Sequence, residues 1–218
     1  GATSTLQNPS HTYQDDGLYS VRLSVTSASG LSVEEKPSFI RVGAVPRIAV
    51  IGASIPPTAA DAAIADHLRA VGYDVVALDD EPGNRPSAAE LAATYGLVMI
   101  SSTPGSASTA GQFRTANVPL IFWENALLRP ARESLTDNGV VEGNTTQINI
   151  INNTHPITQG LAIGNLTVFS SGQNMSLATG NSGPGTQILA RRAGGTEGAI
   201  VVANAGATVA DGYVTPAR

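Results

Sequence analysis

Four short apolar runs, separated by segments with helical spacing, constrain the fold of this chain more than any other feature. Continuous apolar runs of this length are typical of strands that are buried on both faces of a parallel sheet. Apolar residues recur at helical spacing over 58–71, and Ser87 followed by Glu90 forms a capping box before a second helix over 88–94. A third, short helix is expected over 109–115. The pattern predicts a parallel sheet with right-handed crossovers, with strands at 48–51, 74–78, 97–100 and 120–123.

The sequence after residue 128 follows a different pattern, because short apolar segments are separated there by Asn, Gly and Ser. A helix of one or two turns is expected only at 156–161. We interpret this part as a mostly β extension that packs on the parallel sheet, with strands at 147–151, 166–169, 187–190 and 199–202.

The first 43 residues carry strand patterns. Over 19–25, Tyr, Val, Leu and Val alternate with Ser, Arg and Ser, which is the period of a half-buried strand. A turn signal follows at 27–30, and 31–33 and 39–42 are further strand candidates. This part is therefore predicted to be β.

Three segments of this β region, 7–13, 17–25 and 39–42, resemble the second half of a polycystic-kidney-disease (PKD) domain, which is an immunoglobulin-like β-sandwich. The resemblance implies a partial PKD-like β-sandwich over 1–43, with its other strands outside these residues. A short linker is then expected at 44–46.

The remainder, 47–218, resembles the trehalose-utilisation-like branch of the class I glutamine amidotransferase-like superfamily. The most distinctive string is Asn-Thr-His-Pro-Ile-Thr-Gln-Gly-Leu at 153–161, and the other matching segments are 48–52, 95–102 and 118–124. The resemblance implies an α/β flavodoxin-like domain with a parallel sheet and a β-rich extension. It also implies that 210–218 approach a last strand that is missing.

The strand at 120–123 ends where an amidotransferase would carry its nucleophile. Ligands collect at the carboxyl ends of strands in open α/β sheets, and true amidotransferases place a Cys there with His and Glu partners. Here the matching residues are Trp123, Glu124 and Asn125, and the chain has no Cys. Amidotransferase chemistry is therefore excluded, and Ser101 and Ser102 lack the Gly-x-Ser-x-Gly elbow of a serine hydrolase.

Glu124 and His155 are the remaining catalytic candidates. Glu124 would need a second titratable group within reach, for which Asp79 or Asp80 is a candidate. The favoured alternative is that Glu124 binds backbone amides of the adjoining loops, and that His155 fixes the loop before Pro156. A ligand pocket is expected from the strand ends, with the candidates Gly52, Ser54, Ser101, Ser102, Trp123, Glu124 and Asn125.

Net charge, motif content and the spacing of residues argue against several other classes of function. The net charge of −5 argues against a nucleic-acid binder. No dinucleotide-binding or Walker motif occurs, so no cofactor is expected. The three histidines are too far apart in sequence to suggest a metal site. No apolar run reaches the length of a membrane span. Sequons at Asn144, Asn152, Asn165 and Asn174 would mark surface loops in a glycosylating host.

Three hypotheses of function follow. The absence of Cys and the abundance of Ala, Thr, Ser, Gly and Asn favour an extracellular or cell-surface bacterial protein. The leading hypothesis is a non-catalytic pair of modules that serves as a spacer, an adhesion scaffold, or a glycan- or protein-binding region alongside other domains. The alternatives are a carbohydrate-active, enzyme-associated domain with a pocket around Glu124, and an assembly subunit or homo-oligomer completed by strands from a neighbour.

Overall fold

The computed structural model describes residues 2–15, 17–43, 46–81, 83–109 and 111–216. The chain divides into two compact units, 1–45 and 46–218, which we describe separately. Residues 44 and 45 of the expected linker lie outside the described residues, as do 217 and 218 at the end of the expected approach to a last strand.

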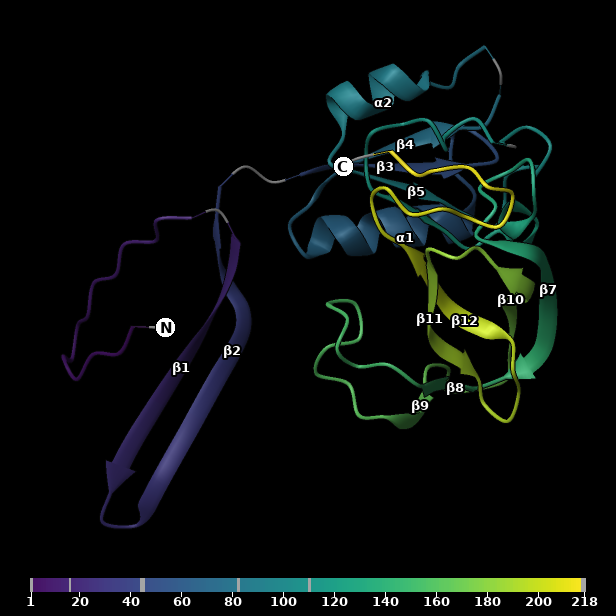
Figure 1. The fold of residues 1–218 in the computed structure, drawn as a ribbon. Helices are drawn as coiled ribbons and strands as arrows, with labels where there is room; N and C mark the ends of the chain where they lie inside the picture. Colours follow the sequence, from purple (N-terminus) through teal and green to yellow (C-terminus); the bar gives the residue numbers. More distant parts are fainter. Residues whose placement is uncertain (1, 16, 44–45, 82, 110, 217–218) are drawn as a thin grey trace. The chain divides into compact units, whose positions relative to one another are not determined.

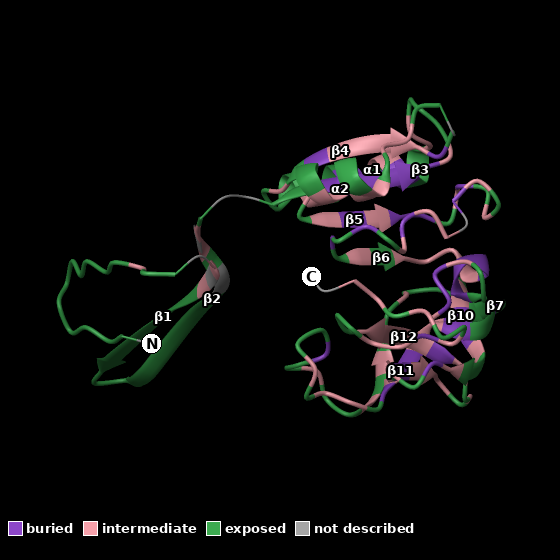
Figure 2. Cartoon of the chain, turned by 45° about the horizontal axis from the view of Figure 1, so that its top comes forward, coloured by how far each residue is buried: buried purple, intermediate pink, exposed green. Residues whose placement is uncertain are grey.

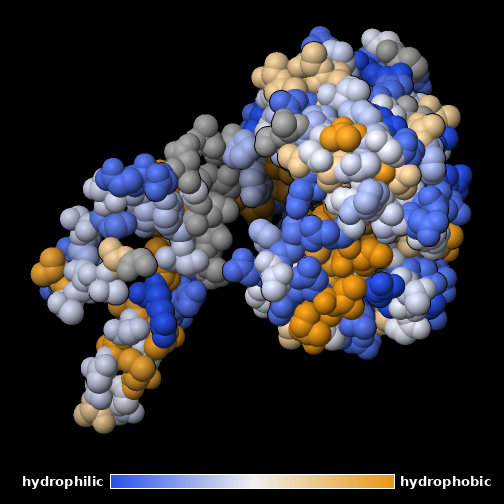
Figure 3. All heavy atoms as spheres, in the orientation of Figure 1, coloured by the Kyte–Doolittle hydropathy of each residue, from blue (hydrophilic) through white to orange (hydrophobic). Residues whose placement is uncertain are grey.

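The first unit is built on one long antiparallel hairpin (Figure 1). Strand β1 spans Gly17–Ser27 and β2 spans Gly30–Val42, so the two short strands expected at 31–33 and 39–42 form one continuous strand. Several large apolar side chains of the hairpin are exposed to solvent (Figure 3). Leu23, Leu31 and Phe39 are 61%, 67% and 59% exposed. A two-stranded hairpin is marginally stable by itself, so this apolar surface favours a further covering layer.

The second unit contains the predicted parallel sheet. Among the described residues this sheet has four strands in the order β4-β3-β5-β6. Continuous apolar runs form them, and β3 is buried from Ile48 to Gly52, as expected for a strand that is covered on both faces. Their bounds are Arg47–Gly52 for β3, Asp74–Asp79 for β4, Leu97–Ile100 for β5 and Leu120–Phe122 for β6.

Helices α1 (Ala59–Ala70) and α2 (Ala88–Thr94) cover opposite faces of this sheet (Figure 1). Alternate residues of β3 pack toward the two helices: Ala49 and Ile51 share a core with Leu91 of α2, and Ile48 and Val50 share one with Ala65 of α1. Figure 2 shows the resulting buried residues within β3, β4 and β5. The predicted capping box is present, because Ser87 and Glu90 bind each other's backbone amides.

The larger sheet of the second unit is antiparallel. In the described part of the chain it has six strands in the order β7-β10-β12-β11-β8-β9. Its strands are β7 (Thr136–Thr145), β8 (Gln147–Ile150), β9 (Gly164–Thr167), β10 (Gln173–Ser182), β11 (Thr186–Arg192) and β12 (Gly198–Ala203).

The predicted α/β flavodoxin-like class is therefore wrong. The described residues are 40% strand and 11% helix, and within them the parallel sheet is the smaller of the two sheets in the second unit. The segment expected as a β-rich extension is a sheet with its own core around Ile148, Ile150 and Ala190. It is thus a principal layer of the fold.

Two predicted helices are also absent from the described residues. Turns and bends occupy 156–161 and the described part of 109–115. A short 3-10 helix, η1 (Asn125–Leu128), follows β6. Strands β7 and β10 were not predicted.

Candidate functional site

A large pocket lies between the edge of the parallel sheet and the antiparallel sheet. Its volume is about 710 Å³. All three residues of β6, Leu120–Phe122, line one side, and all six residues of β12, Gly198–Ala203, line another. The pocket is therefore bounded by strands from two different sheets.

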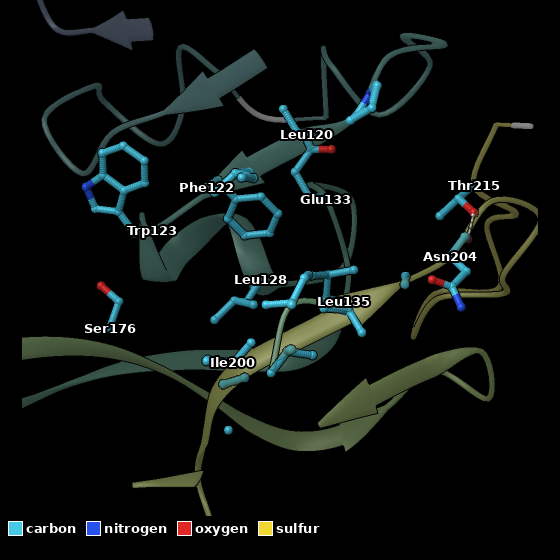
Figure 4. Close-up of a pocket in the computed structure, with 18 of the residues that line it drawn as sticks. Leu120, Phe122, Trp123, Leu128, Glu133, Leu135, Ser176, Ile200, Asn204 and Thr215 are labelled. Atoms are coloured by element: carbon cyan, nitrogen blue, oxygen red, sulfur yellow. Dashed lines mark hydrogen bonds between the residues drawn. The ribbon is translucent and has the colours of Figure 1, made fainter. Parts of the chain in front are cut away.

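The middle of the pocket is apolar and its ends are more polar (Figure 4). At one end, the Thr215 hydroxyl donates a hydrogen bond to the Asn204 carbonyl at 2.6 Å. Trp123 and Ser176 lie toward the other end. Four apolar side chains, Phe122, Leu128, Leu135 and Ile200, lie between the two ends. The buried side chain of Glu133 also lies there. Such a lining suits a ligand that is apolar along its length and polar at its ends.

Glu124 lines this pocket but is engaged in capping. Its carboxylate accepts a hydrogen bond from the Ala126 amide at 3.1 Å, which caps the N-terminus of η1. The neighbouring Asn125 donates from its side-chain amide to the Gly139 carbonyl at 3.2 Å and so joins η1 to β7. Glu124 therefore binds a backbone amide, but this amide belongs to η1 and not to an adjoining loop.

His155 also lines the pocket and is engaged in a turn. Its Nδ1 accepts from the Ile157 amide at 3.2 Å, and its carbonyl accepts from the Thr158 amide at 2.9 Å. The Thr158 hydroxyl donates to the Asn152 carbonyl at 2.6 Å, which closes the loop. Among the described residues, no hydrogen bond joins His155 to Glu124.

The other predicted pocket residues lie elsewhere. Gly52, Ser54, Ser101 and Ser102 do not line the pocket that contains Trp123, Glu124 and Asn125. The Ser54 hydroxyl donates to the Pro56 carbonyl at 2.8 Å, and Ser101 and Thr103 share a hydroxyl hydrogen bond of 2.8 Å. The structure therefore separates the predicted set into two groups.

Two members of the second group lie near a buried carboxylate, Asp61, which is 1% exposed: Gly52 lies beside it, and Ser101 is linked to it through Thr103. Its Oδ2 accepts from the hydroxyls of Thr58 at 2.8 Å and Thr103 at 2.6 Å. A Cβ at Gly52 would lie 2.5 Å from the same oxygen. The carboxylate thus lies in the first turn of α1, where the helix dipole favours a negative charge. Thr58 followed by Asp61 is a capping pattern, which is the only sequence signal for this cluster.

Asp79 and Asp80 cannot assist Glu124. They lie at the carboxyl end of β4, whereas Glu124 follows β6 at the opposite edge of the sheet. Three inter-strand spacings of about 4.8 Å separate these edges by about 14 Å, which exceeds hydrogen-bond reach. Asp80 instead accepts from the Gly105 amide at 3.0 Å, and Asp79 accepts from the Asn84 side chain at 3.3 Å.

A cluster around Asp211 fixes the C-terminal segment beside the pocket. Arg114 donates to both carboxylate oxygens of Asp211 at 2.9 and 3.0 Å, and its guanidinium lies 3.9 Å from the centre of the Tyr213 ring. The Arg114 hydrogen bonds hold the pKa of Asp211 well below its usual range; partial burial opposes them, and donors from Tyr213, Ser134 and Ala131 add to the lowering. No sequence pattern connects Arg114 with Asp211, and sequence reasoning missed the pair.

Two further properties bear on the class of protein. No group of three or more His, Asp or Glu side chains that could hold a metal ion occurs in the described residues. Within the same residues, no helix has both the length and the apolar character needed to cross a membrane.

Comparison with known proteins supports one of the two resemblances. Residues 1–42 match the family model of the PKD domain. No curated protein and no solved structure matches the chain. The resemblance of 47–218 to amidotransferase-like domains receives no support from a family match. The chain therefore carries a PKD-domain match over residues 1–42, followed by a mostly β unit.

Proposed function

We propose that this chain is a non-catalytic spacer and binding region of a large secreted or cell-surface protein, and that it binds a protein partner in the pocket between β6 and β12. The observation that carries the proposal is the pocket itself, which is large and apolar along its middle. Exposed apolar concavities on soluble proteins mark binding sites for ligands and partners.

The positions of the titratable candidates support a non-catalytic role. Glu124 and His155 both line the pocket, yet each accepts a hydrogen bond from a backbone amide two residues further along the chain. A general acid or base needs a partner that orients it toward substrate. These two side chains instead stabilise the local backbone.

The match of 1–42 to a PKD domain supports an extracellular setting, because PKD domains are typically extracellular. A β-sandwich module of this kind suits a spacer. The second unit then supplies the binding surface, and other domains of the same parent chain are its natural neighbours.

Trp123 provides a direct test, because it is the chain's only tryptophan and it lines the pocket. The uncharged apolar dye Nile red should bind in the pocket and quench Trp123 emission in a saturable manner. Ile121→Lys should weaken this binding at least about tenfold, because it places a charge in an apolar wall. Ile121 is 48% exposed, so folding should be little affected.

Val141→Lys is the matched control. Val141 is also an exposed apolar residue of an edge strand, at 53%, but it does not line the pocket. Its variant should bind Nile red like the original chain. Equal quenching of all three proteins would contradict the pocket as the binding site. Quenching by neutral oligosaccharides but not by Nile red would indicate a glycan site instead.

A further inference from the structure

The edge of β6 that faces away from β5 has no strand paired with it in the described part of the chain. The Val98 amide donates to the Pro119 carbonyl, and the Trp123 amide donates to the Ile100 carbonyl. Backbone groups alternate between the two sides of a strand, so Ile121 also faces β5. The amides and carbonyls of Leu120 and Phe122 therefore face the pocket.

Strand β12 presents a second open edge to the same pocket. On one side it pairs with β11 along its length. On its other side, the described pairing with β10 is a single position, Ala178 with Gly198. From Ala199 to Ala203 this second side is unpaired within the described residues.

The lining shows that these edges, and not the faces of the sheets, bound the pocket. A pocket on a sheet face is lined by alternate residues of a strand, because successive side chains point to opposite faces. Here the lining is consecutive in both strands, Leu120–Phe122 and Gly198–Ala203. The walls thus present unpaired backbone donors and acceptors toward the space between them.

Unpaired strand edges are suited to binding one kind of ligand, an extended polypeptide. Their regularly spaced N–H and C=O groups are complementary to the backbone of an extended polypeptide, which is the basis of strand addition. A strand residue within packed sheets occupies roughly 160 Å³, from a rise of about 3.3 Å, a strand spacing of about 4.8 Å and a layer spacing of about 10 Å. The pocket volume of about 710 Å³ then corresponds to about four or five strand residues.

We propose that the pocket is a strand-binding slot, in which an extended segment of a partner polypeptide pairs with the free edges of β6 and β12. The segment is about five residues long. It carries apolar, uncharged side chains at its centre, because Phe122, Leu128, Leu135 and Ile200 occupy the middle of the pocket. This inference rests on the proposed function, because it names the occupant of the same pocket.

The slot can be tested in the whole chain by attaching a strand to it. A Thr-Val-Val-Val-Thr segment is fused after Arg218 through a flexible Gly/Ser linker of about ten residues, whose ends lie about 17 Å apart on average. Thr215 lines the pocket, so the attached segment can reach it at an effective concentration in the millimolar range. The control fusion carries Pro in place of each Val, which removes backbone donors and prevents pairing.

Amide hydrogen exchange measured by NMR is the readout. In the Val fusion, the Leu120 and Phe122 amides should exchange at least about tenfold more slowly than in the Pro fusion. The Ile121 amide should remain slow in both, because it bonds to β5. The same segment, acetylated, amidated and added at millimolar concentration, should shift these two amide resonances if the fusion fails to fold.

Three outcomes would overturn the inference. Equal exchange of Leu120 and Phe122 in the Val and Pro fusions would exclude strand pairing, while saturable Nile red binding would leave the proposed function intact. Concentration-dependent dimers of the untagged chain with the same amides protected would assign the slot to a second copy. A free peptide that quenches Trp123 equally with Val or Pro would indicate an apolar site without backbone pairing.

Discussion

Arg114 and Asp211 lie 97 residues apart in the sequence and form a two-pronged ion pair at 2.9 and 3.0 Å. The two side chains are 14% and 21% exposed. The pair connects the segment before β6 with the C-terminal segment, and both flank the pocket. It is therefore a structural support for the site.

Asp211→Ala should lower the free energy of unfolding by about 2–3 kcal/mol, because it removes charged hydrogen bonds and leaves Arg114 without its partner. Urea unfolding at neutral pH measures this change. Asp66→Ala is the control, because the Asp66–Arg69 ion pair lies in solvent with Asp66 73% exposed. Loss of the Asp66–Arg69 ion pair should lower the free energy of unfolding by less than about 1 kcal/mol. Equal effects of the two substitutions would contradict the supporting role of Asp211.

The carboxyl group of Asp211 should make the free energy of unfolding depend on pH in the acid range. The pKa of Asp211 is lower in the folded chain than its usual value, so the folded state binds fewer protons than the unfolded state. Its contribution is present above the unfolded pKa of about 3.9 and is lost as pH falls through the folded pKa. Asp211→Asn should flatten the acid limb of a stability–pH curve below about pH 4. Parallel curves for the two proteins would show that Asp211 does not contribute to this limb.

Gly52 and Asp61 should be energetically coupled. A Cβ at Gly52 would lie 2.5 Å from Asp61 Oδ2, so Gly52→Ala must displace a carboxylate that two hydroxyls hold. We expect a loss of about 1–3 kcal/mol in unfolding free energy. Gly83→Ala meets no atom within 4 Å and should change stability by less than about 0.5 kcal/mol.

A double-mutant cycle isolates this contact. In a chain that already carries Asp61→Ala, the Gly52→Ala substitution should cost much less, because the atom it displaces is gone. Strictly additive losses would show that the Gly52 effect comes from another neighbour.

Glu124→Ala tests whether this residue acts as a cap. It should lower the free energy of unfolding by about 1 kcal/mol, because the Ala126 amide loses its acceptor. Assays on glycoside and amide substrates should detect no turnover in either protein. A turnover that Glu124→Ala abolishes without a change in stability would establish an enzyme.

The sequence predicted those parts of the fold that local pattern determines. Each of the four parallel strands is a short apolar run, and α2 begins at its predicted capping box. The helix predicted over 109–115 does not form, because Gly111 has a φ of +63°, outside the right-handed helical region. Strands β7 and β10 contain Asn and Gly, which are rare in strands, and they form because they pair with each other. No local pattern reveals such a pairing.

The candidate site was predicted only in part for the same reason. Trp123, Glu124 and Asn125 follow β6 and were expected at a pocket, which they line. The opposite wall, β12, lies about 75 residues further along the chain, and its open edge depends on sheet pairing. A strand edge has no sequence signature, so the slot could be recognised only from the structure.

The most direct test of the strand-binding slot is amide hydrogen exchange at three consecutive residues of β6 in the free chain. An open edge predicts fast exchange at Leu120, slow exchange at Ile121 and fast exchange at Phe122. Attachment of the Val-containing strand should then slow the two outer amides to the rate of the central one. Slow exchange at all three residues in a dilute, monomeric chain would show that the edge is already covered and would contradict the slot.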